Sequence, residues 1–378
     1  MPAQPENPFI YGETLTETAF IDREEEADQL ERDLTDAQKV FLLSPRRFGK
    51  STLIAAVFRR LEKRGIRTAT VPVSNYTTYT EFLEGFADTV LHAAGPYDKV
   101  KGWIGRFLGQ LRPEIGLDPR TGDLHFSFGR SSRSAAPIAA EVFALPGVLA
   151  KHGRFKLAIA LDEFQQIHLF NGGTVEHSLR NAVQAQRQVG YVFAGSQPTL
   201  MEAMLTPKRP FFKAGPAQFL EKIDKTAWQK FIPKQFARRR KVLTPAGLDF
   251  LLTTADLIPY DVQRLAHELW DYAELSGTTT LDVKEVALVT TRLVASHSQY
   301  YERLWEQLAL KQRAVLRALT ARPEAIYHEA VRWEFGLGPT SSVQRALQGL
   351  QKQEIIGRQR QGYFFLDPIF PVWVKERR

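Results

Sequence analysis

A run of nine residues has the spacing of a phosphate-binding loop. It directly follows the apolar stretch 40–43 and consists of Ser44, Pro45, Arg46, Arg47, Phe48, Gly49, Lys50, Ser51 and Thr52. The spacing is G-x-x-x-x-G-K-[ST], except that Ser44 stands where the first glycine is usual. In such a loop the backbone N–H groups surround phosphate oxygens, and the positive end of the following helix adds attraction. We therefore expect these nine residues to bind the phosphates of a nucleotide.

Three residues of this loop have chemistry of their own. Lys50 is expected to contact the terminal phosphates, and the Ser51 hydroxyl to ligate the Mg²⁺ that bridges them. Gly49 is expected because a side chain would block the close approach of the phosphates. A G-K-[ST] tripeptide is common by chance, so an ordinary basic turn between a strand and a helix is the alternative.

A carboxylate pair follows a second apolar run about one hundred residues downstream. The run 157–161 ends in Asp162 and Glu163. Asp162 is expected to hold Mg²⁺ through water, and Glu163 to polarise the water that attacks the γ-phosphate. A strand that meets a solvated helix cap is the alternative, and the phosphate-binding loop upstream favours the catalytic interpretation.

Polar residues also follow a third apolar run, 189–194. Either Ser196 or Gln197 is expected to sense the γ-phosphate, because strand ends of a parallel sheet meet at one edge; alternatively, Ser196 caps the next helix. Arg264, in a predicted helix from Pro259, either contacts the phosphates or lies on the surface. Two further arginines, Arg209 and Arg180, are competing candidates for an arginine finger, with a surface position as the alternative.

The elements that must position these residues alternate between strand and helix. This order predicts a three-layer, parallel α/β sheet over residues 1–225. Asp22 is the expected N-cap of a helix ahead of the loop. A β-hairpin near 113–129 interrupts the alternation, and its role is not assigned. Residues 226–299 are expected to form a helical lid.

Residues 300–378 predict a winged-helix domain. Helices are expected at 302–319, around 324–335 and at 341–353, followed by a β-hairpin. This segment holds 13 Lys plus Arg and 8 Asp plus Glu from residue 301 onward. Arg345 and Lys352 on the third helix, with Arg358 and Arg360 on the wing, suit DNA binding. A winged helix that contacts protein or packs within the chain is the alternative.

Composition limits the class of protein. The 378 residues are 44% hydrophobic and 24% charged, with a formal net charge of +8 and no cysteine. The absence of cysteine excludes disulfides, thiolate nucleophiles and cysteine-based zinc sites. The N-terminus lacks the features of a signal peptide and no apolar run is long enough to span a bilayer, so we expect a cytoplasmic protein with no membrane partner. The positive charge favours an acidic partner.

Several of these stretches together resemble the archaeal-type AAA ATPases, within the wider STAND class of P-loop NTPases. The stretches are F-I-D-R-E-E-E at 20–26, the loop at 44–52, A-L-D-E-F at 160–164, F-A-G-S-Q at 193–197, P-Y-D-V-Q-R-L at 259–265 and D-P-I-F at 367–370 followed by Trp373. The resemblance covers nearly the whole chain and implies an ATPase core, a helical lid and a winged helix.

The resemblance also implies roles for individual residues. By it, Lys50 is the Walker A lysine, Asp162 and Glu163 are the Walker B pair, and Ser196 is the sensor-1 residue. Serine at the first Walker A position is tolerated in that family. Some relatives carry a nuclease module after the winged helix; no such activity is expected from the residues up to Arg378.

The resulting hypothesis is a Mg²⁺-dependent ATPase, with Lys50, Glu163 and Ser196 as catalytic residues. Loss of γ-phosphate contacts to Lys50, Ser196 and Arg264 would free the lid, so that nucleotide drives a conformational switch. We expect this switch to be coupled to DNA binding. A nucleotide-dependent homo-oligomer is a further expectation. Two alternatives stay open: a regulator that binds ATP without hydrolysing it, and a signalling scaffold whose winged helix binds protein.

Overall fold

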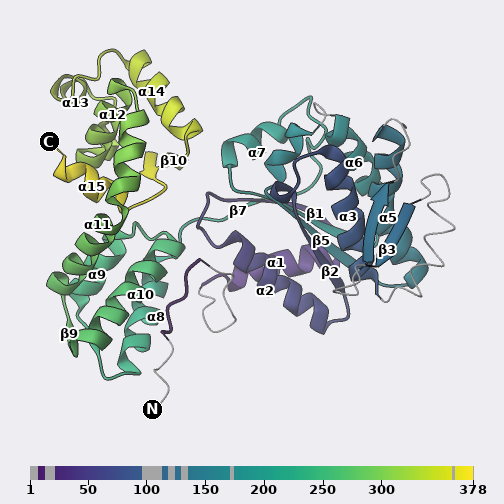
Figure 1. Ribbon diagram of the computed structural model, residues 1–378, viewed down its shortest axis with the longest axis horizontal. Helices are drawn as coiled ribbons and strands as arrows, with labels where there is room; N and C mark the ends of the chain where they lie inside the picture. Colours follow the sequence, from purple (N-terminus) through teal and green to yellow (C-terminus); the bar gives the residue numbers. More distant parts are fainter. Residues whose placement is uncertain are drawn as a thin grey trace. The chain divides into compact units, whose positions relative to one another are not determined.

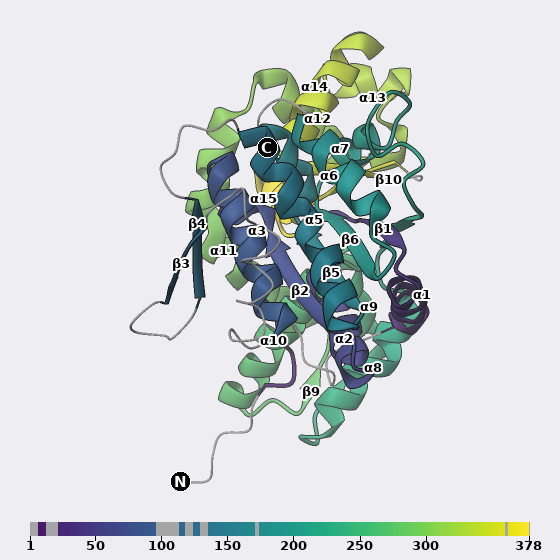
Figure 2. The same cartoon turned by 90° about the vertical axis from the view of Figure 1, so that its right-hand side faces the viewer.

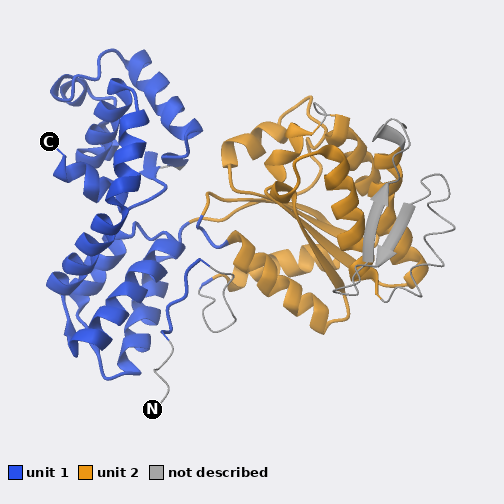
Figure 3. Ribbon diagram, in the orientation of Figure 1, with its two compact units in different colours: residues 1–22, 47–49, 222–378 blue, residues 23–46, 50–221 orange. Residues whose placement is uncertain are grey.

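The computed structural model of the chain describes residues 7–12, 22–95, 113–117, 124–128, 135–170, 174–359 and 362–377. The chain divides into two compact units, coloured separately in Figure 3. Unit 2 comprises residues 23–46 and 50–221, and unit 1 comprises residues 1–22, 47–49 and 222–378. Three residues of the phosphate-binding loop therefore count with the C-terminal part of the chain. The domain borders expected at 225/226 and 299/300 stay predictions.

Unit 2 is built on a parallel β-sheet. Its elements are α1 Glu24–Thr35, β1 Lys39–Leu43, α2 Lys50–Lys63, β2 Arg67–Pro72, η2 Val73–Asn75, α3 Tyr79–Ala94, β3 Pro113–Leu117, β4 Leu124–Phe128, α5 Ala135–Gly153, β5 Leu157–Asp162, η3 Phe164–Leu169, α6 Thr174–Ala185, β6 Val189–Gly195, α7 Pro198–Met204 and β7 Ala217–Phe219. The five-stranded sheet has the order β2-β5-β6-β1-β7, and every pair is parallel.

Helices cover both faces of this sheet. Figures 1 and 2 show α1 and α2 on one face and α3, α5 and α6 on the other. All seven residues of β6 are buried, as are five of the six in β5. A parallel strand covered on both faces needs apolar residues at consecutive positions, which is why these strands are continuous apolar runs in the sequence. The predicted three-layer α/β fold is confirmed.

The hairpin expected near 113–129 is also present. β3 and β4 pair antiparallel, with Ile115 opposite Phe126. Residues 118–123, which join them, lie outside the described residues. Its role stays unassigned.

Unit 1 contains the helical lid and the winged helix. Its elements are α8 Lys225–Ala237, β8 Val242–Leu243, α9 Pro245–Thr254, α10 Pro259–Ser276, β9 Thr280–Leu281, α11 Val283–Gln307, α12 Leu310–Ala321, η5 Pro323–Ala325, α13 Glu329–Glu334, α14 Thr340–Lys352, β10 Ile356–Gln359, β11 Gly362–Phe365 and α15 Phe370–Glu376. The lid has its own apolar core, which includes Trp228, Phe236 and Trp270.

Local signals set the ends of the lid helices. The Thr244 side chain accepts a hydrogen bond from the Gly247 N–H at 3.0 Å, and Pro245 occupies the first turn of α9. At the start of α11, the Glu285 carboxylate accepts from the Asp282 N–H at 2.9 Å. Both caps satisfy N–H groups that have no partner inside the helix.

Two local expectations were wrong. The helix expected at 302–319 is two helices, because Leu308 and Ala309 both adopt extended backbone conformations between α11 and α12. The N-cap of α1 is Arg23 rather than Asp22, whose φ of 47° is not the extended conformation of a capping residue. No helix among those described is both long and apolar enough to cross a membrane.

Candidate active site

The ends of three neighbouring strands bring the predicted site residues of unit 2 together. Leu43 of β1 is in register with Gly195 of β6, and Leu161 of β5 with Phe193 of β6. The strands are parallel, so the segments that follow them leave from one edge of the sheet. Asp162 is the last residue of β5, and the ends of these strands are followed by Lys50, Ser51, Glu163 and Ser196.

Lys50 lies between two carboxylates. Its Nζ donates to Oδ1 of Asp162 and lies 3.7 Å from Oε1 of Glu163. The Ser51 hydroxyl donates to Oδ2 of Asp162 at 3.2 Å. One cation thus faces two anions, and the polar atoms next to it are oxygens. An oxygen-only set with a net negative charge suits Mg²⁺.

Glu163 is held in an unusual backbone conformation. Its φ of 53° lies in the left-handed region, and its N–H donates to Oδ1 of Asp162 at 2.9 Å. The Ser196 hydroxyl donates to Oε2 of Glu163 at 2.5 Å. The amide of Gln165 donates to the same oxygen at 2.6 Å. The structure therefore places Ser196 and Glu163 in direct contact.

Sequence reasoning missed Gln165. It is 1% exposed, between Phe164 and Ile167, which are also fully buried. A long polar side chain within the buried turn that follows the carboxylate pair was the available signal. A buried amide costs free energy unless it is hydrogen-bonded, so such a residue points to a polar partner nearby.

The phosphate-binding loop leaves donors unused. The Ser44 N–H donates to the Gly195 carbonyl at 3.2 Å, while the buried Ser44 hydroxyl has no hydrogen-bond partner among the described residues. In the described part of the chain, the N–H groups of Phe48 and Gly49 donate no backbone hydrogen bond either. Gly49 has φ 88°, and an added Cβ would meet no described atom within 4 Å. Its backbone conformation by itself favours glycine.

Arg47 has its partners within unit 1. Its guanidinium lies 3.7 Å from Asp261 and 3.8 Å from Asp367, and 4.8 Å from the centre of the Tyr260 ring. The next residue, Phe48, packs in a small buried cluster with Ile258 and Phe364.

Asp261 is the buried member of this group. Its side chain is 1% exposed, and neither carboxylate oxygen has a hydrogen-bond partner among the described residues. Burial raises the pKa of Asp261 to about 7, and the Arg47 charge opposes that rise. Burial and the neighbouring Asp367 likewise raise the pKa of Tyr301, whose hydroxyl donates to Asp367 at 3.0 Å.

Other predicted arginines have specific partners. Arg264 is only 6% exposed, which excludes a surface position, and its guanidinium lies 3.0 Å from Nε2 of His297. Its role at the phosphates stays a prediction. Arg209 pairs with the buried Glu176 at 3.3 Å, and Arg180 donates to the Pro210 carbonyl at 3.3 Å.

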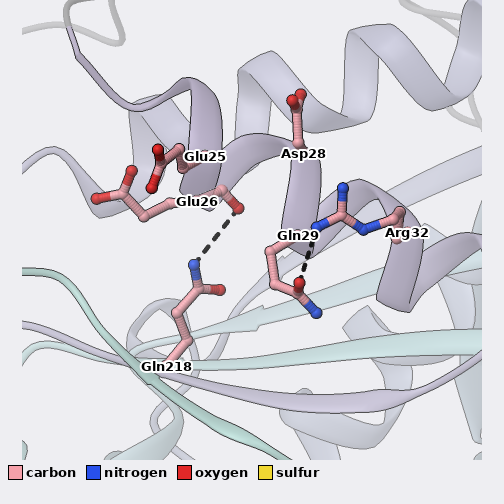
Figure 4. A pocket seen from close by; sticks show the side chains of 6 residues that line it. All are labelled: Glu25, Glu26, Asp28, Gln29, Arg32 and Gln218. Carbon is pink, nitrogen blue, oxygen red and sulfur yellow. Dashed lines mark hydrogen bonds between the residues drawn. The ribbon is translucent and has the colours of Figure 1, made fainter.

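A pocket of unit 2 contains none of the predicted site residues. Figure 4 shows this pocket, of about 440 Å³, beside α1. The Gln218 amide donates to the Glu26 carbonyl at 3.4 Å, and Arg32 donates to Gln29 at 2.9 Å. Oε1 of Gln218 is buried and has no hydrogen-bond partner among the described residues.

The predicted DNA-contacting helix, α14, is amphipathic. Its buried face consists of Val343, Ala346, Leu347 and Leu350. Gln344, Arg345, Gln348 and Lys352 are exposed on the other side. Arg358 is exposed on β10, with its guanidinium 5.9 Å from the Tyr363 ring, and Arg360 lies outside the described residues.

Comparison with known proteins agrees with this architecture. A family model described as "Probable winged helix domain" matches residues 299–376, and no curated protein matches the sequence. Among solved structures, a Walker-type ATPase of Pyrococcus abyssi is similar with a TM-score of 0.64 and 18% identity, over 96% of this chain and 98% of that one.

Two ORC proteins of Aeropyrum pernix are also similar. ORC2, in ADPNP–ADP complexes, has a TM-score of 0.54 at 14% identity, over 98% of this chain and 97% of that one. ORC1, in complex with DNA, has a TM-score of 0.50 at 15% identity, over 96% and 95%. The chain therefore has the fold of these proteins: a parallel α/β core with helices on both faces, followed by a C-terminal winged helix.

Proposed function

We propose that this chain binds ATP with Mg²⁺ and hydrolyses it, acting as a nucleotide-driven conformational switch coupled to DNA binding. The observation that carries the proposal is the meeting of Lys50, Ser51, Asp162, Glu163 and Ser196 at one edge of the sheet. A lysine, a hydroxyl, two carboxylates and a polar strand-end residue are the groups that phosphoryl transfer to water requires.

Each side chain has a distinct task in this proposal. Lys50 leaves its carboxylate partners to bind the terminal phosphates, and the unused N–H groups of Phe48 and Gly49 donate to phosphate oxygens. Ser51 and Asp162 would hold Mg²⁺, which would neutralise charge on the phosphates. Glu163 accepts a proton from the attacking water, and Ser196 lies beside it where the γ-phosphate is sensed.

The first test separates binding from hydrolysis. Lys50→Ala should abolish nucleotide binding, because the loop loses the ammonium group that is expected to contact the terminal phosphates. Glu163→Gln should bind ATP normally and lower turnover by about 10²- to 10⁴-fold. Binding is measured with a fluorescent ATP analogue and turnover by phosphate release. Matched controls are Lys151→Ala and Glu24→Gln on exposed helix surfaces of the same unit.

The outcomes also decide between the alternatives. A wild-type chain that binds ATP but releases no phosphate is the non-hydrolysing regulator. Hydrolysis retained in the Glu163→Gln variant removes Glu163 from its assigned role. Absence of binding in the wild type contradicts the proposal as a whole.

The DNA part of the proposal rests on the winged helix. Support comes from the exposed polar face of α14, from the excess of positive charge after residue 301, and from a structural neighbour whose description includes DNA. Arg345 and Lys352 on α14 and Arg358 on β10 would contact the duplex, and Arg360 is a further candidate from the sequence.

A further inference from the structure

Gln165 is a buried amide with one carboxylate partner and one hydroxyl neighbour. Its Nε2 donates to Oε2 of Glu163 at 2.6 Å and lies 3.4 Å from the Ser196 hydroxyl oxygen. Because a carboxylate only accepts hydrogen bonds, the NH₂ end of the amide must face Glu163. The other end, Oε1, has no hydrogen-bond partner among the described residues. A side chain that only filled space would be better apolar here.

The end of β6 leaves room for this amide. A Cβ added at Gly195 would lie 2.8 Å from Oε1 of Gln165 and 2.4 Å from Cγ of Met201. A side chain at position 195 would therefore collide with the amide. The backbone before Ser196 and the Gln165 side chain fit each other closely.

The two donors engage only one oxygen of Glu163. The Ser196 hydroxyl at 2.5 Å and the Gln165 amide at 2.6 Å both contact Oε2. The other oxygen, Oε1, lies 3.7 Å from the Lys50 ammonium, which itself bonds to Asp162. Oε1 can therefore still accept a hydrogen bond. The two bonds to Oε2 hold the carboxylate in its orientation.

We propose that Gln165 is a positioning residue for hydrolysis: together with Ser196 it holds Oε2 of Glu163 so that Oε1 faces the attacking water. This inference rests on the proposed ATPase function. In the reaction, the water oxygen bonds to the γ-phosphorus while the bond from that phosphorus to the bridging oxygen breaks. The bridging electron pair stays with ADP. The water proton goes to Oε1 of Glu163, which returns it to the released phosphate. Gln165 acts through Glu163 and contacts no nucleotide.

The test uses the full chain and the substitution Gln165→Met, which keeps length and removes both polar atoms. We expect kcat to fall about ten- to one-hundred-fold, as for a misplaced catalytic group. KM and affinity for a non-hydrolysable ATP analogue should not change, because Lys50 and the loop are untouched. Gln166→Met is the matched control: Gln166 is the next residue of the same helix and is partly exposed. Its kcat should equal that of the wild type.

A second variant keeps the test decisive if the first does not fold. Gln165→Glu preserves the shape but places a second carboxylate against Glu163. Two adjacent anions are disfavoured, so the acidic limb of the pH–kcat profile should move to higher pH. An unshifted limb would mean that the side chain at position 165 does not act on the Glu163 carboxylate during turnover.

The outcomes distinguish a failure of the positioning role of Gln165 from a failure of the proposed ATPase function. A wild type without ATP hydrolysis overturns both. If the wild type hydrolyses ATP, an unchanged kcat in Gln165→Met overturns the positioning role alone. So does a loss of kcat accompanied by an equal loss of analogue affinity. A pH profile of Gln165→Glu that superimposes on the wild type has the same consequence.

Discussion

Asp261 is a carboxyl group whose charge works against folding near neutral pH. Its pKa is raised from 3.8 to about 7, first by burial and then by Asp367 and Asp256, with Arg47 and Arg264 opposing. A folded-state pKa above the unfolded value gives stability that is complete below about pH 4 and is lost as pH rises through 7. At full strength the difference corresponds to roughly 4 kcal/mol.

Asp261→Asn should therefore remove much of this pH dependence. The free energy of unfolding of the wild type should fall between pH 5 and pH 8, and the variant should show a flatter profile. Urea denaturation followed by tryptophan fluorescence reports mainly on unit 1, because five of the six tryptophans lie within it. Asp249→Asn, an exposed carboxylate on α9, is the control. A wild-type profile that is flat over this range contradicts the prediction.

Individual residues show how much of the candidate site could be predicted from the sequence. Lys50, Asp162, Glu163 and Ser196 could be named because each follows an apolar strand, and parallel strands end at one edge. Gln165 was missed: its long polar side chain in an otherwise apolar turn was a signal, but the direction of a side chain in a short 3₁₀ turn has no periodic pattern. Asp261 resembles any acid in the first turn of a helix, where a charge is ordinarily solvated. Its burial depends on residues far away in the chain.

Helix α14 is the element that decides the DNA proposal. Arg345→Glu with Lys352→Glu should weaken binding of duplex DNA by the full chain by about tenfold or more and make it less salt-dependent, because each lost phosphate contact lowers the slope by about 0.9. Fluorescence anisotropy of labelled duplex across a salt series measures both quantities.

A control with the same change in net charge distinguishes the loss of α14 contacts from the effect of a lower net charge on DNA binding. Lys230→Glu with Lys234→Glu on α8 changes two exposed lysines of the lid. DNA affinity that drops equally in both double variants indicates a general charge effect. Absence of wild-type affinity at low salt favours a protein partner for the winged helix.

Element boundaries were predicted less well than element types. The break between α11 and α12 falls at Leu308 and Ala309, with neither glycine nor proline to mark it. Leu308 is 3% exposed and belongs to the winged-helix core. The helix breaks where Leu308 packs into this core. The local helix propensity of the segment would instead favour an uninterrupted helix.

Assembly is a property of the whole molecule. If nucleotide drives the formation of a homo-oligomer, the mass in solution should rise when a non-hydrolysable ATP analogue is added, and Lys50→Ala should keep its nucleotide-free mass. Light scattering after size-exclusion chromatography measures this directly. Arg209, 44% exposed and paired with Glu176, should then be required for turnover but not for binding if it completes a neighbouring site. A mass that does not change makes Arg209 and Arg180 plain surface residues.

The two compact units are interleaved along the chain. Unit 2 is interrupted by residues 47–49, which count with unit 1. Phe48 is buried there with Ile258 and Phe364, both beyond residue 221. A fragment that ends at 221 would keep the whole sheet but leave a phenylalanine of the phosphate-binding loop without its apolar neighbours. Although each unit has its own core, the units are therefore poor candidates for recombination as separate modules. A swap of residues 222–378 would remove the apolar neighbours of Phe48 and so destabilise the loop that contains it.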